Sequence, residues 1–144
     1  MAHPSLRSRL DSGLPVHGSF TFLSDPLSIE VMAAAGLEFV VFDMEHSAVD
    51  LADTQHFVRA AQAVGISPIV RIADVAGKVV QRVLDMGAEG VMLPTVDSAA
   101  AAAEFAGQAR YPPAGTRGTC STLRASQFGN HNADWAEFAR SEEH

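Results

Sequence analysis

The sequence predicts an α/β protein built around a parallel β-sheet. Short apolar runs alternate with amphipathic stretches, each of which begins at a capping residue and is followed by a glycine. The run at residues 39–42 is apolar without interruption, which is typical of a strand buried on both faces of a parallel sheet. These two patterns together indicate repeated strand–helix units.

The first half of the chain is expected to contain two such units. Strands are predicted at residues 16–23 and 39–42. Asp25 and Pro26 begin a helix that can run to Gly36, because proline suits the first helical turn. Asp50 is expected to cap a second helix that ends near residue 65.

Two further units are expected after residue 65. Strands are predicted at residues 68–72 and 90–93, with a helix from Asp74 to Gly87 between them. An alanine-rich helix should follow over residues 98–110. The final part is interpreted as a long ordered loop at residues 111–130 and a short helix at 133–140.

Four strand–helix units amount to half of an eight-stranded β/α barrel. The complete fold takes about 250 residues, whereas this chain has 144. We therefore expect one domain over residues 1–144 that covers the first half of such a barrel. A small open four-stranded α/β sheet is the competing architecture, and the pattern fits both.

Composition excludes several classes of protein. The net charge of −7 argues against a broad nucleic-acid surface, which needs clustered lysine and arginine. The apolar runs are too short for a membrane span or a signal peptide. The single cysteine, Cys120, cannot form an internal disulfide and fits a reducing compartment. We expect a soluble, cytoplasmic protein.

A polar cluster directly follows the most apolar strand. Asp43, Glu45 and His46 would lie at its carboxyl end, where α/β proteins usually place their active sites. Two carboxylates on one side of a strand need a compensating cation or donor, and His46 suits a general base near neutral pH. The structural alternative is that Asp43 caps a turn while the other two residues are solvated.

Two charged residues further along are candidate partners of this cluster. Arg71 ends the next apolar run, and its fork of donors suits a carboxylate ligand. A structural ion pair with Asp43 or Glu45 is the alternative for Arg71. Asp85 lies in the last turn of the third predicted helix, where a negative charge opposes the helix dipole. That placement suggests a partner such as a histidine, although a solvated helix end explains it as well.

The loop at residues 111–118 combines prolines and glycines around Arg117. It is expected to fold over the rim of the sheet and close the pocket. An ordinary connector in which Arg117 bonds backbone carbonyls is the alternative.

Five motifs of this chain occur together and in the same order in a known family. They are Phe-Asp-Met-Glu-His-Ser at 42–47, Pro-Ile-Val-Arg at 68–71, Val-Leu-Asp-Met-Gly-Ala at 83–88, Leu-Pro at 93–94 and Arg-Tyr-Pro-Pro-Ala-Gly-Thr-Arg-Gly at 110–118. Residues 18–140 thus resemble the amino-terminal half of the class II pyruvate aldolases. This HpcH/HpaI group includes the 4-hydroxy-2-oxo-heptanedioate and 2-dehydro-3-deoxyglucarate aldolases and is grouped with the citrate lyase β-chain.

The resemblance implies a (β/α)₈ TIM barrel that makes or breaks carbon–carbon bonds through a pyruvate enolate. By position in the motifs, Arg71 matches the arginine that holds the oxo acid, and His46 matches the catalytic base. Asp85 matches the acid that orients this base. Asp43 and Glu45 match acidic residues on the floor of the pocket, next to the waters that the metal binds. The implied substrates are pyruvate and an aldehyde.

The resemblance also implies groups that this chain does not supply. The family uses a divalent cation, Mg²⁺, Mn²⁺ or Co²⁺, whose two carboxylate ligands come from the second half of the barrel. No residue here matches either ligand, so we expect no metal site in this chain and no turnover by it alone. The complete protein is expected to be a homo-oligomer. The alternatives are a citrate lyase β-like lyase of malyl-CoA-type thioesters and a non-catalytic half-barrel fragment.

Overall fold

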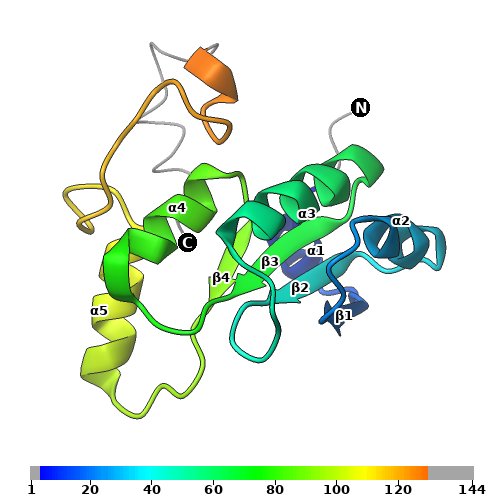
Figure 1. The fold of residues 1–144 in the computed structure, drawn as a ribbon. Helices are drawn as coiled ribbons and strands as arrows, with labels where there is room; N and C mark the ends of the chain where they lie inside the picture. The colour runs from blue at the N-terminus through cyan, green and yellow to red at the C-terminus, as the bar shows by residue number, and fades with distance from the viewer. Residues whose placement is uncertain (1–3, 130–144) are drawn as a thin grey trace.

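Four short strands form one parallel sheet in the order β1-β2-β3-β4 (Figure 1). The computed structural model of the protein describes residues 4–129. Each strand pairs with the strand that follows it in the chain. Strands of a β/α barrel have this order, whereas a doubly wound sheet contains a point where the order reverses. The strands are β1 (Gly18–Thr21), β2 (Phe39–Asp43), β3 (Ser67–Arg71) and β4 (Gly90–Met92).

All four predicted strands are confirmed, with shifted ends. The predicted first strand of eight residues shortens to four at an edge of the sheet, where three of its residues are exposed. The strand predicted at 39–42 extends by one residue to Asp43, and four of its five residues are buried. β2 pairs on both sides, so its unbroken apolar pattern does correspond to a central strand.

The helices begin and end largely where the caps indicate. Asp50 forms a capping box with Asp53, and Gly65 ends the helix with a left-handed φ of 76°. Gly87 also has a left-handed φ, and a Cβ atom there would lie 2.8 Å from the side chain of Gln62. The longer helices are α2 (Leu27–Ala34), α3 (Leu51–Val64), α4 (Val79–Asp85) and α5 (Ala99–Ala109).

The third predicted helix is divided, which the sequence did not indicate. Asp74 does accept a hydrogen bond from the backbone N–H of Ala76 and so begins the turn. A 3₁₀ turn, η1 (Ala76–Lys78), comes first and ends at Lys78, whose φ of 60° is left-handed. The continuous i to i+4 ladder can begin only after that residue, at Val79.

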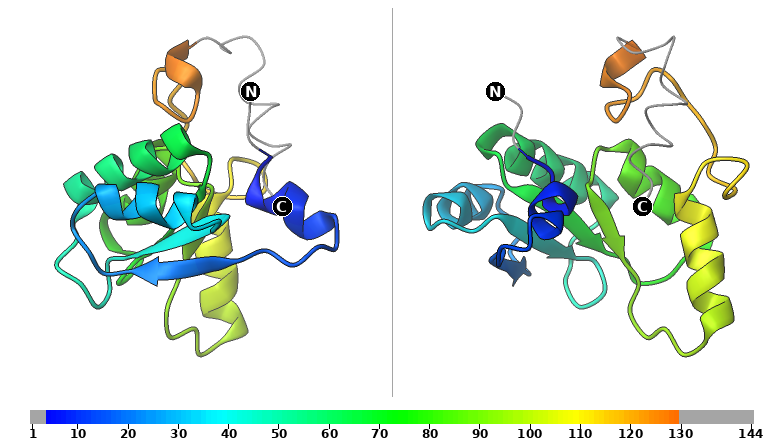
Figure 2. Two further views of the ribbon diagram at one scale, coloured as in Figure 1. Left: turned by 90° about the vertical axis from the view of Figure 1, so that its right-hand side faces the viewer. Right: turned by 180° about the vertical axis from the view of Figure 1, so that it is seen from behind.

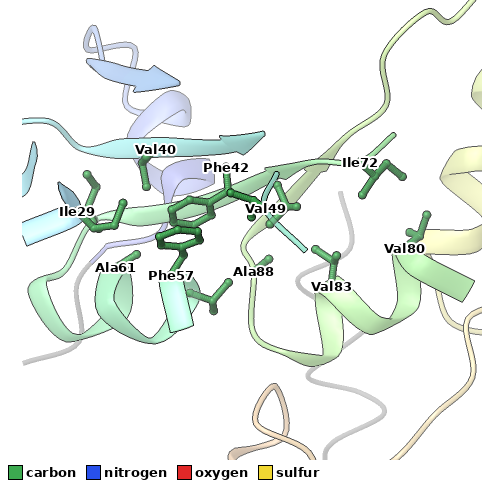
Figure 3. Packing of buried hydrophobic residues seen from close by; sticks show 13 residues of the cluster. Ile29, Val40, Phe42, Val49, Phe57, Ala61, Ile72, Val80, Val83 and Ala88 are labelled. Carbon is green, nitrogen blue, oxygen red and sulfur yellow. The ribbon is translucent and has the colours of Figure 1, made fainter. Parts of the chain in front are cut away.

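The hydrophobic core lies between the sheet and the helices (Figure 3). The Phe42 and Phe57 rings are fully buried and stacked, with centroids 4.9 Å apart. Val80 and Val83 extend the same core under α4. Because strand residues alternate in direction, Val41 and Asp43 point to the other face of the sheet.

A short amino-terminal helix, α1 (Leu6–Asp11), was not predicted. Figure 2 shows it beside the sheet. The Leu6 N–H donates to the Glu89 carboxylate at 2.9 Å, and Arg9 donates to Glu38 at 3.2 Å. Both acceptors directly precede a strand, so α1 lies at the amino ends of the strands.

The segment after α5 is irregular, as predicted, and contains one 3₁₀ turn, η2 (Gln127–Gly129). The helix predicted at 133–140 lies outside the described residues. None of the helices within residues 4–129 has the length and apolarity that a bilayer crossing requires.

Candidate active site

The polar residues singled out by sequence meet at the carboxyl edge of the sheet. Asp43 ends β2, Arg71 ends β3, and the strand register places the two residues side by side. The connections that follow β2, β3 and β4 all leave from this edge, whereas residues 111–129 lie on the far side of α4 (Figure 1). A ligand bound at this edge would therefore contact side chains from neighbouring strands.

A two-pronged ion pair joins Arg71 to Asp43. Arg71 Nε donates to Asp43 Oδ1 at 3.0 Å, and Arg71 Nη2 donates to Oδ2 at 2.5 Å. The Asp43 side chain is fully buried and also accepts the backbone N–H groups of Glu45 and His46. This geometry fixes the plane of the guanidinium group. The structural ion pair that sequence left open is thus present.

These contacts control the charge on Asp43. The hydrogen bond from Arg71 is the main cause that lowers the pKa of Asp43 from 3.8 to about 2, although burial of the carboxyl acts in the opposite direction. The backbone donors of Glu45 and His46 lower this pKa further. Asp43 is therefore a carboxylate at neutral pH and pairs with Arg71 in its charged form.

Glu45 connects the arginine to the histidine. Its Oε2 lies 3.3 Å from Arg71 Nε, and its Oε1 lies 3.6 Å from His46 Nε2. The His46 side chain is 67 % exposed, so solvent and ligands reach the imidazole. Arg71 Nη1 makes no hydrogen bond to any of residues 4–129, and the Arg71 side chain is 20 % exposed.

Sequence reasoning missed one contact at this site. The ring of Phe20, from β1, lies 4.9 Å from the Arg71 guanidinium carbon. Phe20 lies in a predicted strand, and nothing in the sequence around it indicated a contact with a site residue. The strand register alone could have suggested it, because β1 pairs with β2 and exposes Phe20 on the edge strand.

Asp85 lies elsewhere. It ends α4, and its Oδ1 accepts a hydrogen bond from Arg117 Nη2 at 2.8 Å. Gln81, one turn earlier, bonds both Asp85 and the backbone N–H of Gly118. α4 returns from the carboxyl edge toward the start of β4, so the expected contact of Asp85 with His46 is not made within this chain.

The loop at residues 111–118 does not close the site. It packs on the helix layer, where the Arg117 guanidinium lies 4.4 Å from the Tyr111 ring centroid. Arg117 bonds a carboxylate in place of the backbone carbonyls that the connector hypothesis expected. The loop follows α5, which has already returned from the carboxyl edge, so chain direction keeps it away from His46.

Comparison with known proteins decides the family. Residues 17–134 match the HpcH/HpaI aldolase/citrate lyase family. This chain is a member of that family. The resemblance carried by the five motifs is thus confirmed over most of the chain.

Relatives of this HpcH/HpaI member include enzymes and solved structures. It is 31 % identical over 138 residues to a hydroxypyruvate/pyruvate aldolase of Paraburkholderia phytofirmans, covering 96 % of this chain and 52 % of the relative. It matches an HpcH/HpaI aldolase structure from Desulfitobacterium hafniense with a TM-score of 0.85 and 35 % identity, covering 96 % of this chain and 54 % of the other. It matches the structure of the citrate synthase SbnG with a TM-score of 0.78 and 41 % identity, covering 88 % and 52 %. The chain thus spans about half the length of these relatives.

The described part of this HpcH/HpaI chain does not fit a divalent cation. Residues 4–129 contain no cluster of three acidic, histidine or cysteine side chains that could hold a metal. Arg71 bonds both oxygens of Asp43 and contacts one oxygen of Glu45. Carboxylates neutralised by an arginine are poor ligands for a hard cation.

A cavity of about 920 Å³ lies away from this site. It is lined by residues of α1, α5 and the segment after α5, together with the start of β4. None of Asp43, Glu45, His46 and Arg71 lines it. We assign the candidate active site to the carboxyl edge because the side chains that can bind an anion or transfer a proton gather there.

Proposed function

We propose that this chain is the amino-terminal half of a metal-dependent (β/α)₈ aldolase barrel. The complete domain would make or break carbon–carbon bonds in 4-hydroxy-2-oxo acids through the enolate of pyruvate. Family membership and the relative named hydroxypyruvate/pyruvate aldolase support this class of reaction. The observation that carries the proposal is Arg71, held by Asp43 and connected through Glu45 to His46 at the carboxyl edge.

The sheet supports the half-barrel part of the proposal. Four parallel strands follow one another in order, and β1 and β4 each pair on one side only within residues 4–129. Closure of a barrel would pair both edges with further strands. On this proposal residues 1–144 form a single unit of four strand–helix repeats.

Arg71 would bind the oxo acid. Asp43 bonds Nε and Nη2 of the guanidinium, which leaves Nη1 to bind a ligand. A carboxylate or enolate oxygen bound there is stabilised by a charge-assisted hydrogen bond. Because Asp43 keeps the guanidinium in place beforehand, little reorganisation is needed when negative charge develops on the ligand.

His46 would act as the base. The neutral imidazole removes a proton from the methyl group of bound pyruvate, and the electrons of the broken C–H bond form the enolate. The enolate carbon then attacks the carbonyl carbon of the aldehyde, and the alkoxide formed takes a proton from the His46 imidazolium, which returns the base to its neutral form. Glu45, 3.6 Å from Nε2, stabilises the imidazolium formed in between.

The steps above use neither the divalent cation nor Asp85, both of which the family resemblance leads us to expect. A divalent cation, Mg²⁺, Mn²⁺ or Co²⁺, would supply Lewis-acid stabilisation of the enolate oxygen in the complete domain. Because residues 4–129 offer it no ligand cluster, we expect the 144-residue chain to bind oxo acids without turnover. The family motif keeps Asp85 as a candidate orienting acid, although its carboxylate bonds Arg117 here.

The test is a pyruvate titration of the 144-residue chain followed by NMR. Pyruvate should shift the signals of Arg71 and His46, and Arg71→Ala should abolish these shifts. Arg59→Ala is the matched control, because Arg59 is exposed on α3, away from the carboxyl edge. Shifts confined to other parts of the chain would contradict the proposal. Pyruvate methyl-proton exchange with added Mg²⁺ would show that the chain does hold a metal site.

A citrate lyase-like activity on malyl-type acyl thioesters is the second candidate. The family includes citrate lyases, and the structural match to the citrate synthase SbnG reaches 41 % identity. Arg71 would then hold a carboxylate of the acyl group. Competition between malyl thioesters and 4-hydroxy-2-oxo acids in the same titration separates the two candidates.

The proposal also concerns assembly and location. Within residues 4–129, β1 and β4 each have one side without a paired strand, and Leu27 and Val31 of α2 are exposed. These surfaces favour a homo-oligomer or another covering partner. A non-catalytic half-barrel that associates with itself would show the same surfaces, and its mass in solution would exceed that of a monomer without any oxo-acid binding. The single, free cysteine supports a cytoplasmic location.

A further inference from the structure

Phe20 lies in an unusual place for a large apolar residue. It belongs to the edge strand β1, opposite Val41 in the strand register, and the residue is 40 % exposed. Val41 in turn pairs with Ile69, two residues before Arg71 on the same side of β3. Phe20 and Arg71 thus share the sheet face that points away from the helix layer.

The Phe20 ring lies against a face of the Arg71 guanidinium, whereas the ion pairs occupy one of its edges. Asp43 and Glu45 contact the guanidinium edge at Nε and Nη2. The Phe20 ring lies 4.9 Å from the guanidinium carbon. A cation at this distance is attracted by the ring, and the ring also keeps water from that face.

We infer that Phe20 is a positioning residue that holds the Arg71 guanidinium in the orientation that presents Nη1 to an anionic group of a 2-oxo acid. This inference rests on the proposed function for the identity of the ligand. Its structural part, the restraint of Arg71 by the ring, does not depend on any ligand.

The restraint matters because Arg71 has two competing carboxylate partners. Nε lies 3.0 Å from Asp43 Oδ1 and 3.3 Å from Glu45 Oε2. Without the ring, the long side chain gains freedom to leave Asp43 and pair with the more exposed Glu45. Phe20 therefore favours the two-pronged bond to Asp43, in which Nη1 stays free.

The simpler explanation is that Phe20 is exposed only because β1 is an edge strand. Phe22, 56 % exposed and two residues further on, provides a matched control. Among residues 4–129, the aromatic–cation contacts found are those of Phe20 with Arg71 and of Tyr111 with Arg117. A general effect of removing an exposed ring near β1 should therefore be the same in both phenylalanine variants.

The first experiment needs no ligand. Side-chain NMR of the 144-residue chain measures hydrogen exchange at Arg71 Nε–H in the wild type, Phe20→Leu, Phe20→Tyr and Phe22→Leu. We expect exchange about two- to fivefold faster in Phe20→Leu, as the strength of an exposed cation–π contact implies. Phe20→Tyr should restore the wild-type rate and Phe22→Leu should keep it. An unchanged rate in Phe20→Leu would overturn the inference.

The second experiment measures affinity for pyruvate and for oxalate in the same variants. Phe20→Leu should weaken binding about two- to fivefold, and Phe20→Tyr should not. Equal affinity in the wild type and Phe20→Leu would overturn the positioning role. If the wild type binds neither compound, the proposed function fails, while the exchange experiment still decides whether Phe20 restrains Arg71.

Discussion

The Asp85 carboxylate accepts a hydrogen bond from Arg117 at 2.8 Å, and this ion pair attaches the segment after α5 to the last turn of α4. The two side chains are only 15 % and 8 % exposed. Arg117 also stacks on Tyr111, while its buried Nε has no hydrogen-bond partner among residues 4–129. Asp85 thus balances the buried positive charge of Arg117.

Asp85→Ala should therefore destabilise the fold strongly. Removal of one partner from a buried ion pair leaves a buried charge, which costs about 3 kcal/mol. Urea unfolding of the variant measures this loss. Asp11→Asn is the control, because Asp11 pairs with Arg7 on the surface and should change stability by less than about 1 kcal/mol. Equal small losses in both variants would contradict the structural role of Asp85.

Acid should remove a defined part of the stability through Asp43. Its pKa is lowered in the folded state, so its contribution is present above pH 3.8 and is lost as pH falls toward about 2. The shift corresponds to about 2 kcal/mol. In Asp43→Asn the free energy of unfolding should depend less on pH in that range, as measured by urea unfolding between pH 5 and 2. Asp97→Asn, at an exposed position outside the site, is the control variant.

The stacked rings of Phe42 and Phe57 should contribute most of the free energy with which α3 packs on the sheet. Phe57→Ala removes a fully buried ring that stacks on Phe42 and should cost about 3 to 5 kcal/mol. Phe57→Leu keeps most of the volume and should cost less. Val64→Ala, at the exposed end of α3, is the control. Thermal unfolding measures all three, and a small loss in Phe57→Ala would contradict the packing in Figure 3.

The amino end of α3 should depend on Asp50. Its carboxylate accepts from the backbone N–H groups of Ala52 and Asp53, which have no partner within the helix. Asp50→Ala should cost about 1 kcal/mol, whereas Asp50→Ser should cost much less because serine also caps helices. Urea unfolding distinguishes the two, and equal losses would show that the capping bonds contribute little.

Much of the fold follows from short-range patterns. Asp50 and Gly65 fix the ends of α3 because one satisfies free N–H groups and the other adopts a left-handed φ. The apolar run of β2 is read correctly because a central parallel strand is buried on both faces. The break at Lys78 was missed, since no local signal announces a left-handed φ at a lysine.

The site shows the same division. Sequence placed Asp43, Glu45, His46 and Arg71 at one edge because polar residues at the carboxyl ends of parallel strands meet there. It could not place Asp85, whose partner is 32 residues away in a loop that packs on the helix layer. It also missed Phe20, because a ring over a guanidinium reveals itself only when distant strands pair.

The family, the order of strands and helices, and the edge at which the charged residues gather can all be predicted from the amino-acid sequence. Each of these depends on local periodicity, on caps or on short motifs. The pairing of the charges, Arg71 with Asp43 and Arg117 with Asp85, becomes known only from the folded structure. Ion pairs depend on distances of a few ångströms between segments far apart in the chain, and those distances exist only after the sheet and the helix layer have packed.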